Sequence, residues 1–95
     1  MASLADIIRK EYEIYATENH QKPDLRYLDS PLVQKHVMSI AGKSSIYAIK
    51  DNELAKQIYL SVQNDIENIN AHQNYSAALL HYCKFLSLKI SVKKL

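Results

Sequence analysis

The run NYSAALLHYCKFL, from Asn74 to Leu86, constrains the fold of this chain more than any other segment. Apolar and aromatic residues recur along it at steps of three and four, which places them on one side of an α-helix. These residues are Tyr75, Ala78, Leu79, Tyr82, Cys83 and Leu86. Because Leu80 and Phe85 lie on the opposite side, the helix is apolar around most of its circumference and needs neighbours on several sides. We therefore predict that it is the central helix of a small bundle.

The scarcity of chain breakers also favours helices. The chain has one glycine and two prolines among its 95 residues. An all-β fold needs a turn signal about every ten residues, so this composition argues against one. The apolar content of 47% and the charged content of 23% are ordinary for a globular domain. We predict an all-α fold in which residues 1–95 form a single helical domain, a small four-helix bundle with irregular connectors.

Capping signals locate the predicted helices. Ser3 is a favourable N-cap, and Ser30 followed by Pro31 is a typical helix start. Gly42 suits a left-handed residue at a helix end, and Asp51 is a further N-cap. The predicted elements are helices over residues 3–19, 30–42, 51–70 and 74–89, with irregular connectors at residues 20–29 and 43–50.

Two details of this arrangement follow from the apolar pattern. The third helix carries a stripe from Leu54 to Ile69, and its short link to the fourth predicts an antiparallel hairpin. Residues 86–92 alternate between apolar and polar, which is a strand signal, and such a strand could pair with residues 46–49. We favour a helix that continues to about Lys89. The predicted core comprises Leu4, Ile8, Tyr12, Val33, Val37, Ile40, Leu54, Ile58, Val62, Leu79, Tyr82 and Leu86.

No arrangement of residues in the sequence defines a chemistry. Cys83 is the single cysteine, which excludes an intramolecular disulfide, and we expect it to be a small buried apolar residue. No two histidines stand four residues apart, although His72 and His81 could approach each other across the helical hairpin. A glycine-rich phosphate loop is absent from the sequence. We predict a non-enzymatic protein with no catalytic residue, no metal site and no cofactor.

The aromatic composition indicates a partner-binding face. The chain has seven tyrosines, one phenylalanine and no tryptophan, and tyrosine suits both core edges and interfaces. Tyr27 and Tyr47 fall in the two predicted connectors, where we expect them to be exposed. The predicted partner-binding residues are Tyr27, Tyr47, Leu80 and Phe85. The expected partner is another protein or a second copy of the chain, with a dimer as the expected homo-oligomer.

The uneven charge supports an alternative partner. The net charge is +2, but residues 71–95 carry four lysines and no acid. Basic residues interleaved with aromatic residues are also typical of nucleic-acid binding. The signature of such binding is an affinity that falls steeply as the salt concentration rises. The residues of this alternative are Lys22, Arg26, Lys43, Lys50, Lys84, Lys89, Lys93 and Lys94.

Two segments of the second half carry a resemblance to known proteins. SIYAIKDNELAKQIY, residues 45–59, and the run YSAALLHYCKFL resemble small helical segments of prokaryotic defence and mobile-element proteins. The resemblance implies a bacterial or phage accessory module that positions a protein on DNA or on a partner. It transfers no catalytic residue, and the nuclease domain that usually accompanies such a segment is not in this sequence. In architecture the chain is also similar to bacteriocin immunity proteins, which are small, basic and helical.

The N-terminal segment indicates the compartment. MASLADIIRKEYEIY has charged residues from position 6 and no long apolar run, unlike a signal peptide. No stretch of the sequence is long and apolar enough to predict a membrane span. We expect a cytoplasmic protein without membrane association.

Overall fold

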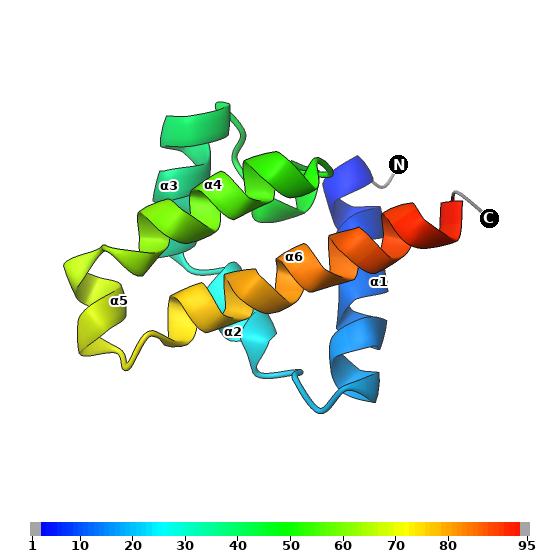
Figure 1. The fold of residues 1–95 in the computed structure, drawn as a ribbon, viewed down its shortest axis with the longest axis horizontal. Coiled ribbons are helices and arrows are strands. Elements are labelled where there is room, and N and C mark those ends of the chain that lie inside the picture. Colours follow the sequence, from blue (N-terminus) through cyan, green and yellow to red (C-terminus); the bar gives the residue numbers. More distant parts are fainter. Residues whose placement is uncertain (1–2, 94–95) are drawn as a thin grey trace.

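The computed structural model describes the backbone of residues 3–93 and the side chains of residues 3–88, and its regular elements within this range are all helical. The α-helices are α1 (Leu4–Glu18), α2 (Asp24–Leu28), α3 (Pro31–Ala41), α4 (Asn52–Gln63), α5 (Ile66–Asn70) and α6 (Asn74–Lys93), with a 3₁₀ turn, η1 (Ile46–Ala48) (Figure 1). The all-α prediction is confirmed. The long helices α1, α3, α4 and α6 overlap the four predicted ones, α2 is an addition, and α5 occupies the end of the predicted third helix.

The predicted helix ends follow their local signals. The Ser3 hydroxyl accepts a hydrogen bond from the Asp6 amide at 3.2 Å, and the Asp6 carboxylate accepts one from the Ser3 amide at 3.3 Å. This reciprocal capping box begins α1. Gly42 ends α3 in the left-handed region with φ of +67°, where a residue with a side chain would be strained. Both boundaries are set by residues within one turn of the helix end.

The two predicted connectors are more ordered than expected. Residues 20–29 contain α2, so the prediction of an irregular link is wrong for its second half. The buried Leu25 and Leu28 stabilise this short helix by packing on the core. Residues 43–50 contain the 3₁₀ turn η1, and Ile46 and Ile49 from this connector enter the core.

The predicted third helix is two helices. The chain leaves the α4 axis at Asn64, and the Asp65 carboxylate caps α5 by accepting a hydrogen bond from the Glu67 amide at 2.9 Å. The apolar stripe continues in register through this break, but Ile66 and Ile69 are exposed. The helical periodicity of the apolar residues therefore predicted a longer helix than the one that forms.

Helix α6 is the central element. It lies beside α4 and runs in the opposite direction, with α5 making the reversal, and it also contacts α2 and crosses α1 (Figure 1). The antiparallel arrangement and the central position of α6 agree with the predictions. The strand alternative for residues 86–92 is wrong, because α6 continues to Lys93. No helix in the part of the chain that the structure describes combines the length and apolar character needed to cross a bilayer.

The core is built around aromatic rings. The Tyr12 ring centroid lies 5.3 Å from that of Phe85 and 5.5 Å from that of Tyr82, and Tyr82 lies 5.8 Å from Tyr47. These buried rings join α1, η1 and α6. Tyr12, Tyr47 and Tyr82 therefore belong to the core and do not form an exposed aromatic surface.

Most of the predicted core positions are buried. Leu4 is the clear error, since its side chain is 46% exposed in the first turn of α1. Ile40 and Leu54 lie half-buried at the edge of the core. The other predicted core residues, Ile8, Tyr12, Val33, Val37, Ile58, Val62, Leu79, Tyr82 and Leu86, are buried.

Candidate functional site

The four residues predicted to bind a partner have different environments. Tyr47 is 3% exposed and Phe85 is 7% exposed, so the expectation that they lie on an open face is wrong. Both pack within the aromatic core, because η1 turns inward and α6 is covered by α1 at Phe85. Tyr27 is half-buried and packs edge-on against Tyr75, with ring centroids 5.1 Å apart. Leu80 alone is well exposed, at 51%.

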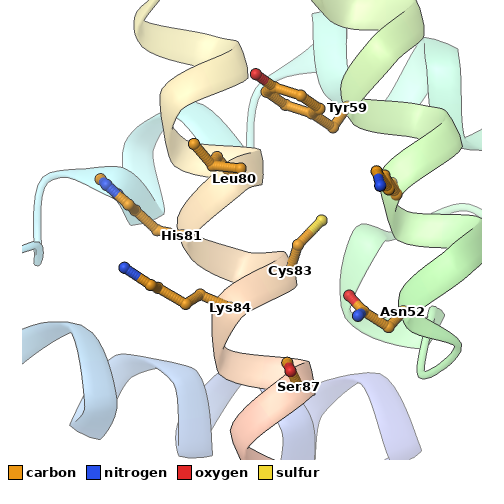
Figure 2. A pocket seen from close by; sticks show the side chains of 8 residues that line it. Asn52, Tyr59, Leu80, His81, Cys83, Lys84 and Ser87 are labelled. Carbon is orange, nitrogen blue, oxygen red and sulfur yellow. The ribbon is translucent and has the colours of Figure 1, made fainter.

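Leu80 borders a groove between α4 and α6, here called the α4–α6 groove (Figure 2). The groove has a volume of about 450 Å³ and follows about two turns of each helix. Its lining residues are Asn52, Lys56 and Tyr59 from α4, and Leu80, His81, Cys83, Lys84 and Ser87 from α6. Two of the α6 side chains that line the groove, Cys83 and Ser87, are small and fill little of the space beside α4.

Cys83 points from α6 toward α4 at the floor of this groove (Figure 2). Burial raises the pKa of its thiol to about 11, and the nearby Lys56 ammonium only partly opposes this shift. A thiol with this pKa is almost entirely protonated at neutral pH, and the thiolate is the reactive form. Cys83 therefore acts as an apolar floor residue, and it is half-buried at the edge of the core, where the sequence predicted a buried side chain.

The groove is cationic at its rim. Lys56 and Lys84 flank the apolar floor, and none of the described lining residues is acidic. Among the predicted nucleic-acid-binding residues whose side chains the structure describes, Lys84 alone belongs to this groove.

The other predicted basic residues are dispersed. Lys22 and Arg26 border a separate shallow depression at α2, and Lys43 and Lys50 lie on either side of η1. The side chains of Lys89, Lys93 and Lys94 lie outside those that the structure describes. Among the predicted basic side chains that the structure describes, no more than two therefore lie at either depression.

A polar cluster joins three helices beside the groove. The Asp24 carboxylate accepts a hydrogen bond from the Tyr12 hydroxyl at 3.3 Å and lies 2.6 Å from Nδ1 of His81. Burial raises the pKa of the Tyr12 hydroxyl well above its usual value, and the Asp24 charge adds to the shift. Tyr12 therefore remains a neutral donor, and the cluster ties α1 and α2 to α6.

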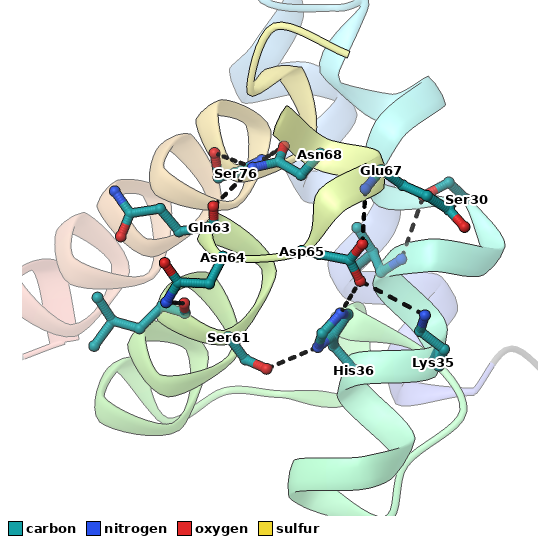
Figure 3. Close-up of polar contacts among 12 residues, drawn as sticks. Ser30, Lys35, His36, Ser61, Gln63, Asn64, Asp65, Glu67, Asn68 and Ser76 are labelled. Carbon is teal, nitrogen blue, oxygen red and sulfur yellow. Dashed lines mark hydrogen bonds and ion pairs between the residues drawn. The ribbon is translucent and has the colours of Figure 1, made fainter. Parts of the chain in front are cut away.

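A second cluster has the residue types of a hydrolase triad (Figure 3). His36 lies between Ser61 and Asp65, with Nδ1 at 2.7 Å from the Ser61 hydroxyl and Nε2 at 2.7 Å from the Asp65 carboxylate. The ring nitrogens are used in the reverse order of a serine protease triad. Ser61 also lies inside α4, where the helix's own hydrogen bonds occupy the amides that could form an oxyanion hole. The cluster fastens α3 to the α4–α5 junction.

Asp65 makes this cluster sensitive to acid. The hydrogen bond from His36 is the main reason that the pKa of Asp65 lies below its usual value, and the Glu67 amide and the Lys35 ammonium act in the same direction. A lowered carboxyl pKa in the folded state stabilises the fold at pH values above about 4, where the unfolded carboxyl is ionised. This stabilisation is lost as the pH falls through the folded-state pKa.

We expect the replacement Asp65→Asn to lower the free energy of unfolding by about 1 kcal/mol at pH 7. The amide retains the cap on the Glu67 amide but removes the charge that faces His36 and Lys35. Urea unfolding measured between about pH 7 and pH 2 should show the gap between the variant and the wild type closing in acid. Asp51→Asn, which alters a similar cap on the Glu53 amide, is the matched control and should not reproduce this effect. A gap that stays constant with pH would contradict the assignment.

The structure does not bring the two predicted histidines together. His72 precedes α6 in the turn after α5, and His81 lies in α6 about 10 Å further along the helix axis. Within the described residues, no group of three or more histidine, cysteine, aspartate or glutamate side chains could hold a metal ion.

Sequence reasoning missed most of the groove. Lys56 and Tyr59 share a face of α4 at a spacing of three, and Leu80 and Lys84 share a face of α6 at a spacing of four. Each pair was visible in the sequence, but only the register between α4 and α6 places them around one depression.

Comparisons with known proteins give no relative for this arrangement: no family model, no curated protein and no solved structure matches the chain. The function is therefore argued from the groove and its residues.

Proposed function

We propose that this protein is a non-enzymatic helical interaction module that binds a partner protein in the α4–α6 groove. The observation that carries the proposal is the exposed Leu80 beside an open groove whose floor is apolar. Exposed apolar surface rimmed by polar residues is typical of interaction sites. The resemblance of residues 45–59 and of the α6 segment to accessory segments of prokaryotic defence and mobile-element proteins supports a module of that origin.

The polar clusters support the non-enzymatic character. His36, Asp65 and Ser61 contact one another across a helix junction, and His81 is engaged by Asp24. Cys83 lines the groove, and its raised thiol pKa disfavours attack on a substrate. These histidine, aspartate and serine side chains connect helices to one another, whereas the groove is open to a partner.

Peptide selection tests this function without knowledge of the natural partner. A display library of random peptides of about 16 residues, long enough for four helical turns, is selected against the folded protein. We expect selected peptides to lose binding by about tenfold or more to Leu80→Lys, because truncating or charging a central apolar contact costs more than 1 kcal/mol.

Ile14→Lys is the matched control, since Ile14 is similarly exposed but lies on α1. Both variants should keep the wild-type far-UV circular dichroism spectrum, because exposed substitutions rarely alter stability. Selection that yields no binders, or binders that ignore Leu80→Lys, would contradict the proposal.

A further inference from the structure

We infer that the occupant of the α4–α6 groove is an acidic amphipathic helix of a different protein. This inference rests on the proposed function and names its class of partner. Three features of the groove carry it: its shape, the charge of its rim and the consequence of that charge for self-association.

The shape of the groove fits one face of a helix. It is lined over two turns of α4 and two turns of α6, from Asn52 to Tyr59 and from Leu80 to Ser87. An amphipathic helix laid along such a groove presents apolar side chains at spacings of three and four residues. Leu80, Tyr59 and Cys83 provide the apolar surface for two or three of these side chains.

The positive charge of the rim determines which residues are favourable on either side of the apolar face of that partner helix. Lys56 projects from α4 and Lys84 from α6, and no described lining residue carries a negative charge to neutralise them. Both lysines are exposed, so each can meet a carboxylate of a partner without desolvating a buried charge. Acidic residues beside the apolar face therefore add affinity and accelerate association, whereas basic residues there would be repelled.

The same rim argues against a second copy of this chain in the groove. In a two-fold symmetric dimer the same patch meets itself, so Lys56 and Lys84 of one copy would face those of the other. Like charges at close range disfavour such a contact. The earlier expectation of a homodimer is thus less consistent with this surface than an acidic partner.

The peptide selection described above tests the inference through the charge of its products. We expect selected peptides to combine apolar residues at helical spacing with a net negative charge. Their affinity should fall by about tenfold for the double variant Lys56→Glu, Lys84→Glu, and it should fall as salt rises above about 0.15 M. Repeating the selection on the double variant should enrich basic peptides instead.

A matched control uses two lysines outside the groove. Lys43→Glu combined with Lys50→Glu makes the same change in net charge beside η1 and should leave peptide affinity within about twofold. Cys83 provides a second readout, because it lines the groove and a bound helix should slow the alkylation of its thiol by iodoacetamide.

The outcomes separate the two proposals. Neutral or basic peptides that bind at Leu80 would overturn the acidic helix and leave the interaction module standing. Peptides whose binding ignores Leu80→Lys would overturn both. A short duplex DNA that binds at about 0.15 M salt, competes with the peptides and depends on Lys56 and Lys84 would overturn the acidic helix in favour of nucleic acid.

Discussion

Replacement of Tyr82 by alanine is expected to lower the free energy of unfolding by about 3–5 kcal/mol. Its side chain is fully buried at the point where α1, η1 and α6 meet, and its ring contacts those of Tyr12, Tyr47 and Phe85. Its hydroxyl also donates a hydrogen bond to the Ile49 carbonyl at 2.9 Å. A domain of this size has a total stability of about 5–15 kcal/mol, so this variant should lose a large fraction of its stability.

Two further variants separate the contributions at Tyr82. Tyr82→Phe retains the ring and leaves the buried Ile49 carbonyl without its donor, so it should cost about 1–2 kcal/mol. Ile14→Ala, at an exposed position on α1, should change stability by less than about 0.5 kcal/mol. The measurement is urea unfolding followed by far-UV circular dichroism. Equal midpoints for Tyr82→Ala and Ile14→Ala would contradict the central position of α6.

Replacement of Asn68 by alanine should cost about 2–4 kcal/mol. Asn68 is fully buried and its amide joins three segments (Figure 3). Its Oδ1 accepts a hydrogen bond from the Ser76 amide at 3.0 Å, and its Nδ2 donates to the Ser76 hydroxyl at 3.0 Å and to the Gln63 carbonyl at 3.5 Å. Alanine would leave the buried Ser76 amide without its acceptor, and an unsatisfied buried group costs about 1–3 kcal/mol. The Ser76 hydroxyl would lose its bond from Asn68 but keep its own donation to the Gln73 carbonyl at 3.1 Å.

The backbone next to Asn68 adds to this expectation. His72 and Gln73 both have positive φ, of 57° and 62°, a conformation that costs energy for residues other than glycine. The Gln73 amide donates to the main-chain carbonyl of Asn68 at 2.7 Å, a bond that alanine would keep. The variant would lose the side-chain contact to Ser76 at the far end of this turn.

Asn70→Ala is the matched control for Asn68, because Asn70 ends the same helix and is exposed. It should change stability by less than about 0.5 kcal/mol. Hydrogen exchange of the first turn of α6 should accelerate in Asn68→Ala beyond the change expected from global stability alone. Unchanged stability of Asn68→Ala would contradict the assigned role of the amide in the α5–α6 junction.

The parts of the fold that the sequence predicted are those with local causes. The capping box at Ser3, the start at Pro31 and the left-handed Gly42 depend on residues within one turn of the helix end. Helix α2 was missed because it has five residues and no side-chain cap, so its stability comes from burial of Leu25 and Leu28.

The break between α4 and α5 was missed for a related reason. The apolar stripe runs through it, and the capping Asp65 could be recognised only as an ordinary polar residue within a helix. Its contact with His36 from α3 is a tertiary interaction, which helical periodicity cannot reveal.

The candidate site was partly predictable. Leu80 could be found because it lies off the buried stripe of its own helix. Tyr47 was placed wrongly, because aromatic residues in a connector can turn inward when the connector forms a 3₁₀ turn. The floor and rim of the groove required the relative register of α4 and α6, which no local pattern in this chain specifies.

The most direct test of the groove is chemical-shift mapping of the ¹⁵N-labelled protein with the tightest selected peptide. We expect the largest perturbations at Lys56 and Tyr59 on α4 and at Leu80, Cys83 and Lys84 on α6. Perturbations centred on the exposed side of α1, around Ile7 and Ile14, or at Lys22 and Arg26 on α2, would contradict the assignment of the α4–α6 groove as the binding surface.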